Sequence, residues 1–368
     1  MTAVGVGGRA ERLLNVLGER DLDQMMVSDR SNIRWLSGFT GSAGVLIISA
    51  RGHVLVTDGR YTEQARDQLD AAGATDVEVV SARTLGEQHN AVIAAAGGKA
   101  IGAEASVVSY GTWSNFAARV DLVGVDGVIS DLRRSKDDAE VELIAQAADI
   151  ASHALADVAP MIAVGVSERE IRDELEYRMR KLGADGPSYE TIVASGPTNA
   201  ALPHARPTTR QFAEGDTVVI DVGALVGGYH SDMTRTFVVG EPTDEQQRWY
   251  QLVLEAQMAG LDAVEAGARV SDVDRACRSV FESVGLSELF VHGTGHGVGL
   301  DIHEEPFLGT SGQTELVMGD VVTVEPGLYR VGTGGIRIED LVVVTSEGHQ
   351  NLTTHPKDSP CLPSRRTI

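Results

Sequence analysis

The feature that most constrains the fold is an internal repeat in the second half of the chain. Residues 165–183, GVSEREIRDELEYRMRKLG, align with residues 267–285, GARVSDVDRACRSVFESVG, with a glycine at both ends of each copy. Between these glycines the apolar residues coincide at helical spacing, which predicts the same buried helix face in both copies. Chance similarity between amphipathic helices is the alternative. We expect a duplicated unit of helix and strand.

The strands that follow each predicted helix also repeat. GDTVVIDVG (215–223) aligns with GDVVTVEPG (319–327), which brings Asp221 onto Glu325. SDMTRTFVVG (231–240) resembles IRIEDLVVVT (336–345), and this pattern predicts Asp232 and Glu339 in the middle of their strands. Two such halves folded face to face would be related by a pseudo-twofold axis.

The acids in these strands predict a metal site. A charge that ends an apolar run such as VVI is costly to bury unless it is paired or bound to a metal. Asp221 and Asp232 of one half would face Glu325 and Glu339 of the other, and two divalent cations would cancel their four charges. His296, between glycines in GTGHGVG, can add one nitrogen ligand to this oxygen-rich set.

The expected cofactor is therefore a pair of divalent metal ions. Carboxylate ligands with a single imidazole favour Mn²⁺, with Co²⁺, Fe²⁺ and Zn²⁺ as alternatives. Structural zinc held by cysteines is excluded because the chain contains only Cys277 and Cys361. A pair of ions in one site is typical of hydrolytic aminopeptidases.

Four strings of the second half resemble the metal-binding blocks of the pita-bread metallopeptidases, the family of methionine aminopeptidase, aminopeptidase P and prolidase. They are DVGALVGGYHSDMTRTF, HGTGHGVGLDIHEEP, VEPGLY and GGIRIEDLVVV, within residues 131 to about 350. The resemblance implies a pita-bread catalytic domain with five metal ligands. These are Asp221, Asp232, His296, Glu325 and Glu339, of which Asp232 and Glu339 would bridge or chelate both ions.

The resemblance also implies roles for residues around the substrate. His204, in LPHARP, matches a histidine on the substrate side, although a loop histidine without function is the alternative. His292 and His303 match the pair that flanks the substrate and stabilises the tetrahedral intermediate. Arg337 matches an arginine that orients a ligand carboxylate. In a peptidase that cleaves the bond before a proline, Glu325 is expected to carry a proton toward the nitrogen of that proline.

The first 130 residues predict a separate α/β domain, followed by the catalytic domain over residues 131–368. Strands are expected near 25–27, 44–48, 53–57, 76–80 and 100–102, and helices near 62–69, 85–96 and 110–119. NIRWLSGFTGSAG (32–44) and TDGRYTEQA (57–65) resemble the N-terminal domain of creatinase and of bacterial Xaa-Pro peptidases. The predicted fold class is α/β (α+β), and the resemblance implies a homodimer.

The implied reaction is hydrolysis of the Xaa-Pro bond in proline-containing peptides or dipeptides. A catalytically inactive peptide-binding module and a creatinase-like C–N hydrolase are the alternatives, and the five intact ligands argue against both. Dipeptidase and aminopeptidase P stay open, because Phe307 stands where some archaeal-type prolidases have an arginine. Arg206 or Arg60 is the candidate for binding the carboxylate of a dipeptide.

Charge and hydropathy exclude other classes of function. The 31 basic and 53 acidic residues give a net charge of −22, which repels nucleic acids. The chain contains no apolar run long enough to span a membrane, and its first residues lack the pattern of a signal peptide. Two cysteines suit a reducing compartment. We therefore expect a cytoplasmic protein without a nucleic-acid or membrane partner.

Overall fold

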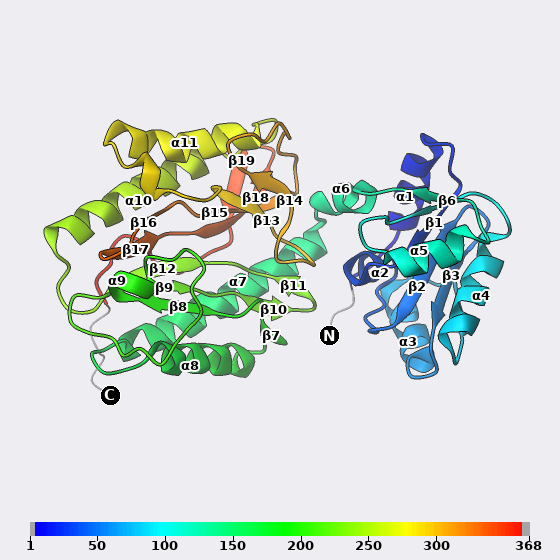
Figure 1. The fold of residues 1–368 in the computed structure, drawn as a ribbon, viewed down its shortest axis with the longest axis horizontal. Coiled ribbons are helices and arrows are strands. Elements are labelled where there is room, and N and C mark those ends of the chain that lie inside the picture. Colours follow the sequence, from blue (N-terminus) through cyan, green and yellow to red (C-terminus); the bar gives the residue numbers. More distant parts are fainter. Residues whose placement is uncertain (1–3, 363–368) are drawn as a thin grey trace. The chain divides into compact units, whose positions relative to one another are not determined.

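The computed structural model describes residues 4–362 and contains two compact units, which divide between Arg133 and Arg134 (Figure 1). The N-terminal unit is built on a mixed six-stranded sheet in the order β4-β3-β2-β1-β5-β6. Its strands are β1 Gln24–Val27, β2 Gly44–Ser49, β3 His53–Thr57, β4 Val77–Ser81, β5 Ile101–Ala103 and β6 Leu122–Gly124. Its helices are α1 Arg9–Gly18, α2 Arg30–Ser37, α3 Thr62–Ala72, α4 Leu85–Ala96, α5 Tyr110–Ala117 and α6 Val128–Arg134.

All five strands expected in the first 130 residues are present, and β3 and α4 have the expected bounds. The sequence analysis did not identify α1, α2, α6 and β6. The helix α2 has only eight residues, too few for a clear helical period, and it begins where the Asp29 side chain accepts a hydrogen bond from the Asn32 amide. Its start is therefore set by a cap rather than by an apolar stripe.

The C-terminal unit, which begins at Arg134, contains two halves of the same construction. The first comprises α7 Asp138–Val158, α8 Glu168–Lys181, β7 Gly186–Pro187, β8 Ile192–Ser195, α9 Gly196–Asn199, β9 Thr217–Asp221, β10 Ala224–Val226, β11 Tyr229–His230 and β12 Thr234–Val238. The second comprises α10 Asp244–Asp262, α11 Val270–Ser283, β13 Gly295–Gly297, β14 Glu304–Leu308, β15 Val321–Val324, β16 Gly327–Arg330, β17 Gly334–Arg337, β18 Asp340–Thr345 and β19 Gly348–Asn351. The repeated segments contain α8 and α11, then β9 and β15, then β12 and β18.

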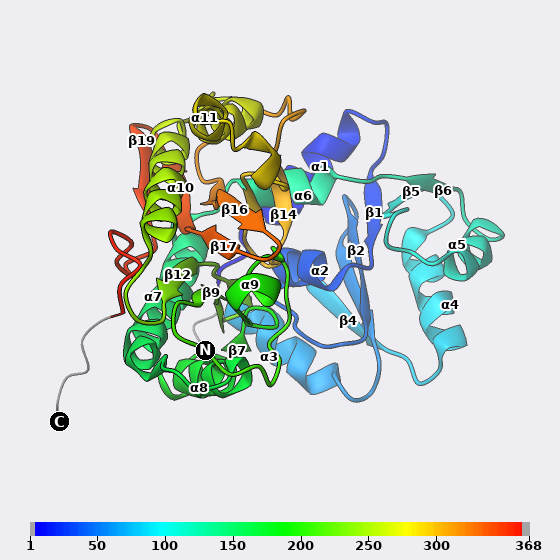
Figure 2. The same cartoon turned by 60° about the vertical axis from the view of Figure 1, so that its left-hand side comes forward.

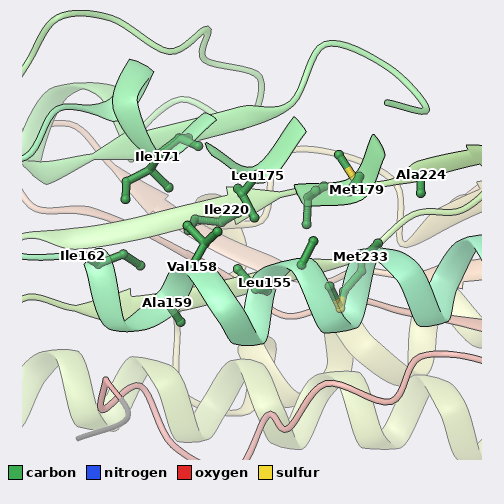
Figure 3. Packing of buried hydrophobic residues seen from close by; sticks show 14 of the residues in the cluster. Leu155, Val158, Ala159, Ile162, Ile171, Leu175, Met179, Ile220, Ala224 and Met233 are labelled. Carbon is green, nitrogen blue, oxygen red and sulfur yellow. The ribbon is translucent and has the colours of Figure 1, made fainter. Parts of the chain in front are cut away.

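The strands of this unit lie between two helix pairs, α7 with α8 on one side and α10 with α11 on the other (Figures 1 and 2). Each pair covers strands of its own half: the sheet β12-β9-β8 in the first half and β14-β13-β15-β18-β19 in the second. Figure 3 shows Leu155 of α7 and Leu175 of α8 lying around Ile220 of β9. Each half therefore has its own apolar core.

The expectation that Asp232 and Glu339 lie in the middle of strands is wrong. β12 begins at Thr234 and β18 at Asp340, so both acids precede their strands. The ladder of the second half starts at Val324 and Asp340, and the Glu339 amide instead donates to the Thr234 carbonyl of the other half (3.1 Å). A contact between the halves therefore engages the backbone of Glu339, where the ladder of the second half stops.

None of the helices in residues 4–362 combines the length and the apolar character that crossing a membrane requires.

Candidate active site

A cavity of about 690 Å³ in the C-terminal unit is lined by residues of both halves. All nine residues that the sequence analysis proposed for the site lie in its wall. They are His204, Asp221, Asp232, His292, His296, His303, Glu325, Arg337 and Glu339. The repeat therefore places its acids around one cavity, as the pseudo-twofold arrangement requires.

A three-residue cluster in this cavity has the geometry of a metal site. Ligand atoms of Asp232, His296 and Glu339 all lie within 4.8 Å of one another, and all three residues are buried. His296 Nε2 is 3.5 Å from Asp232 Oδ2 and 3.5 Å from Glu325 Oε1. Asp221, at the end of β9, is the fifth proposed ligand and is held by an arginine described below.

The glycines beside His296 allow the backbone to approach its neighbours closely. A Cβ atom on Gly295 would lie 2.0 Å from the Thr323 carbonyl oxygen, and one on Gly297 would lie 2.3 Å from the Glu305 carbonyl oxygen. No larger residue fits at either position without moving the backbone. β13 can therefore lie against β14 and β15 and carry His296 to the carboxylates.

Arg337 connects the carboxylates to the surrounding strands. The residue is 2 % exposed, and its guanidinium donates through Nη2 to Asp221 Oδ2 (2.6 Å) and through Nε to Thr234 Oγ1 (2.9 Å). Its Nη1 donates to the Tyr329 hydroxyl and to the Pro203 carbonyl, each at 2.9 Å. Burial opposes the charge, yet Tyr329 and Asp221 outweigh it and hold the pKa of Arg337 well above its ordinary value.

The electrostatics of the carboxylates fit bound cations. Burial, and then repulsion by neighbouring carboxylates, raise the pKa values of Asp232 and Glu339 well above the ordinary range. Burial also raises the pKa of Glu325. Divalent cations would offset both effects, because they favour the ionised carboxylate. The set of four carboxylates and one imidazole therefore fits divalent metal ions. Asp232, His296 and Glu339 are the three whose ligand atoms already lie near enough to one another to share an ion.

Tyr189 belongs to the site, although the sequence analysis missed it. Its hydroxyl donates to Oδ1 of Asp221 and of Asp232, and it lines the cavity. Burial first, and then the charges of Asp221 and Asp232, raise the pKa of Tyr189 well above its usual range. A tyrosine in the loop PSYE carries no pattern that separates a packed ring from one that orients two acids.

Thr234 and Tyr329 were also missed. Thr234 Oγ1 donates to Glu339 Oε2 (2.6 Å), and the Tyr329 hydroxyl lies 3.0 Å from His292 Nε2. Both residues stand inside the strings that resemble the metal-binding blocks, so their proximity to ligands in the sequence was the available signal.

The three substrate-side histidines, His204, His292 and His303, all line the cavity. Burial lowers the pKa of His292, and burial followed by nearby His296 lowers that of His303. Both imidazoles are therefore neutral near pH 7 and can each donate or accept a hydrogen bond. The rings of His303 and His296 lie 4.4 Å apart. His204 is exposed and lies in an irregular segment between α9 and β9.

The two acids of the sequence HEEP that were not proposed as ligands lie outside the cavity wall. Glu304 pairs with Lys136 (2.6 Å), and both side chains are nearly fully buried. Arg206 does line the cavity, where its exposed side chain forms an ion pair with Glu190. Arg60 belongs to the N-terminal unit and pairs with Asp58 (2.7 Å).

Comparison with known proteins identifies the class of this site. Residues 142–346 match the family model "Metallopeptidase family M24", and residues 9–135 match the "Creatinase/Prolidase N-terminal domain". An uncharacterized peptidase of Bacillus subtilis, YqhT, is 36% identical over 95% of this chain and 99% of its own. These matches confirm the predicted fold class, a creatinase-like domain followed by a pita-bread catalytic domain.

Two solved structures resemble the whole chain. An Xaa-Pro dipeptidase from Bacillus anthracis has a TM-score of 0.92 and 38% identity, with coverage of 97% of this chain and 100% of that chain. An X-Pro aminopeptidase from Thermotoga maritima has a TM-score of 0.87 and 35% identity, with coverage of 96% and 99%. The chain therefore belongs to metallopeptidase family M24 and is a metal-dependent peptidase.

Proposed function

We propose that this protein is an exopeptidase that uses two divalent metal ions to hydrolyse the Xaa-Pro bond of peptides or dipeptides. The observation that carries the proposal is the convergence of five ligand candidates and three histidines from both halves on one cavity. The names of the similar proteins, Xaa-Pro dipeptidase and X-Pro aminopeptidase, support the same bond specificity. Neither an inactive binding module nor a C–N hydrolase acting on creatine has comparable support.

Asp221, Asp232, His296, Glu325 and Glu339 would hold the two ions, with Mn²⁺ as the preferred metal and Co²⁺, Zn²⁺ or Fe²⁺ as alternatives. When bound, such a pair polarises the scissile carbonyl and lowers the pKa of a water molecule. In the cavity, Asp221 and Asp232 are oriented by Tyr189, and Asp221 also by Arg337. These contacts fix the ligand oxygens before any ion binds.

The remaining residues of the site position the peptide and move protons. Glu325 is partly buried, its pKa is raised by burial, and it accepts a hydrogen bond from Thr323 Oγ1 (3.3 Å), which suits a group that carries a proton to the proline nitrogen. His303 would donate to the developing oxyanion, and His204 would hold the residue after the scissile bond. An Xaa-Pro nitrogen carries no hydrogen, so a pocket shaped for the ring selects it without an N–H contact.

A metal-reconstituted assay with Ala-Pro and Ala-Pro-Ala tests the proposal. We expect turnover of at least one peptide with Mn²⁺ and about two metal ions per chain by elemental analysis. Glu325→Gln should abolish turnover and leave the circular dichroism spectrum unchanged. Absence of turnover with Mn²⁺, Co²⁺ and Zn²⁺ would refute the assignment, as would full activity of Glu325→Gln.

The same assay separates a dipeptidase from an aminopeptidase P. Arg206 is the exposed cation in the described part of the cavity wall, and a dipeptide carboxylate would have to compete with Glu190 for it. We therefore expect Arg206→Ala to reduce kcat/KM for Ala-Pro more than for Ala-Pro-Ala. An equal loss for both peptides would remove Arg206 as the residue that reads the carboxylate.

Two further properties complete the proposal. A homodimer is the proposed assembly, and light scattering of the purified protein tests it. The cytoplasm is the proposed compartment. It suits the two free cysteines, of which Cys277 is buried and Cys361 is exposed.

A further inference from the structure

A fully buried carboxylate outside the metal site holds the loop that carries His204. Glu168 is the first residue of α8 and is 0 % exposed. Its Oε1 accepts hydrogen bonds from the Ser195 amide (2.8 Å) and hydroxyl (2.7 Å), and Asn199 Nδ2 contacts both oxygens (3.1 and 2.9 Å). Its Oε2 also accepts from the Thr208 amide (2.8 Å) and hydroxyl (2.7 Å). Three positions of one segment therefore converge on a single side chain.

These bonds close the segment 199–208 into a loop at its base. Asn199 and Thr208 share the Glu168 carboxylate, and Asn199 Nδ2 also reaches Thr208 Oγ1 (3.3 Å). Between them lie Pro203 and His204, which line the cavity, and Arg337 donates to the Pro203 carbonyl (2.9 Å). The loop is thus fixed at its base by Glu168 and near His204 by Arg337.

The repeat shows that the fold itself does not require an acid at this position. The corresponding first residue of α11 is Val270, and its backbone makes the equivalent contact: Val270 N donates to Thr314 O (3.0 Å), as Glu168 N donates to Arg210 O (3.1 Å). The Val270 side chain packs instead against Gly312, where a Cβ would lie 2.3 Å from Val270 Cγ2. The acid therefore occurs in the half whose returning loop carries His204, where it has six hydrogen-bond contacts.

We propose that Glu168 is a positioning residue, which fixes the 199–208 loop so that His204 meets the substrate. The inference rests on the proposed substrate-side role of His204. A misplacement of about 1 Å in a substrate-positioning group can cost about 100-fold in rate. Glu168→Gln keeps the shape of the side chain but replaces one acceptor oxygen with an NH₂ donor. Either the Ser195 amide and hydroxyl or the Thr208 amide and hydroxyl therefore lose their acceptor.

A double-mutant cycle tests whether Glu168 acts through His204. We expect Glu168→Gln to lower kcat/KM for the preferred Xaa-Pro peptide by about 10- to 100-fold, and by less than about threefold when His204→Ala is already present. Mn²⁺ stoichiometry should stay unchanged, because no ligand lies on the loop. The partly exposed Asn199→Ala variant, which removes one side of the loop base, should show the same coupling if Glu168→Gln folds poorly.

Glu140→Gln is the matched control, since Glu140 is a buried carboxylate of the same half that accepts from the Tyr229 hydroxyl (2.7 Å). Glu140→Gln should change kcat/KM by the same factor with and without His204→Ala. Hydrogen exchange of residues 196–210 gives a readout that needs no activity: Glu168→Gln should accelerate exchange there, whereas Glu140→Gln should not. Equal losses of kcat/KM in both backgrounds would overturn the proposal. Unchanged exchange in this segment would overturn it even if the wild type cleaved no Xaa-Pro peptide.

Discussion

Replacement of Arg337 by lysine should damage both stability and the orientation of a ligand. The arginine donates to four groups in different directions: the buried Thr234 Oγ1 and Tyr329 hydroxyl, and the partly buried Asp221 carboxylate and Pro203 carbonyl. A lysine ammonium places its three donors on one atom and cannot reproduce this fork. We expect it to keep the charged contact with Asp221 and to lose at least two of the others.

The size of the effect follows from the number of contacts. A buried group that loses its hydrogen-bond partner costs about 1–3 kcal/mol, so two lost partners cost about 2–6 kcal/mol. For a domain of this size, 1 kcal/mol corresponds to about 2–4 °C in Tm, and Arg337→Lys should lower Tm by about 10 °C. Removing a residue that orients a metal ligand commonly lowers metal affinity or activity by about 10- to 100-fold, and we expect a loss of kcat/KM of this size.

Differential scanning calorimetry and steady-state kinetics at fixed Mn²⁺ measure the two effects. Arg178→Lys is the control, because Arg178 also pairs with two acids, Glu174 (2.6 Å) and Asp157 (3.3 Å), but its side chain is 39% exposed. That variant should change the free energy of unfolding by less than about 1 kcal/mol. If Arg337→Lys were as stable and as active as Arg178→Lys, the guanidinium fork would not be what orients Asp221.

Three further predictions concern metal and pH. Tyr189→Phe removes the hydroxyl that orients Asp221 and Asp232 and should weaken Mn²⁺ binding about tenfold in a calorimetric titration, whereas unchanged affinity would contradict that role. Chelation of the metal should lower Tm, because ions at 100 times Kd add about 2.7 kcal/mol for each site, and a Tm insensitive to chelator would count against a resident metal. Burial and Arg235 lower the pKa of His355 to about 4, below the unfolded value of about 6.5. The unfolded chain therefore binds a proton more readily at this residue, and the folded state loses stability as pH falls from about 6.5 to about 4. His355→Gln should remove about 2–3 kcal/mol of that loss between pH 7 and 4.5 in urea titrations, and an unaltered pH slope would show that another group causes it.

The repeat made most of the architecture and the acids of the site predictable. An acid that ends an apolar run is unusual on energetic grounds, and finding Asp221 and Glu325 at matching places in two copies favoured a shared site over chance. His296 was predictable because the glycines beside it mark close backbone approach. These signals can be read from a single sequence, because each depends either on the immediate neighbours of a residue or on the alignment of one copy with the other.

The residues that were missed act through contacts that local spacing does not encode. Glu168 resembles an ordinary acid in the first turn of a helix, where the helix dipole favours a carboxylate, and only the folded loop 199–208 reveals its burial. Tyr189 reaches two acids that follow it by 32 and 43 residues in the chain. The start of β18 was misplaced for the same reason, because the Glu339 amide donates to the Thr234 carbonyl of the other half and the ladder begins only at Asp340. The ladder of β12 with β9 likewise begins only at Thr234.

The two halves of the catalytic unit pack separate apolar cores, but polar contacts join them at the site. Thr234 of the first half donates to Glu339, and Thr236 Oγ1 donates to the Arg337 carbonyl (2.9 Å). The ligand candidates are divided in the same way, with Asp221 and Asp232 from one half and Glu325, Glu339 and His296 from the other. Ions bound by both sets would offset repulsion across the junction as well as within each half. Metal binding by both sets would therefore couple to the mutual placement of the halves, and we expect a substitution on either side of the junction to affect both.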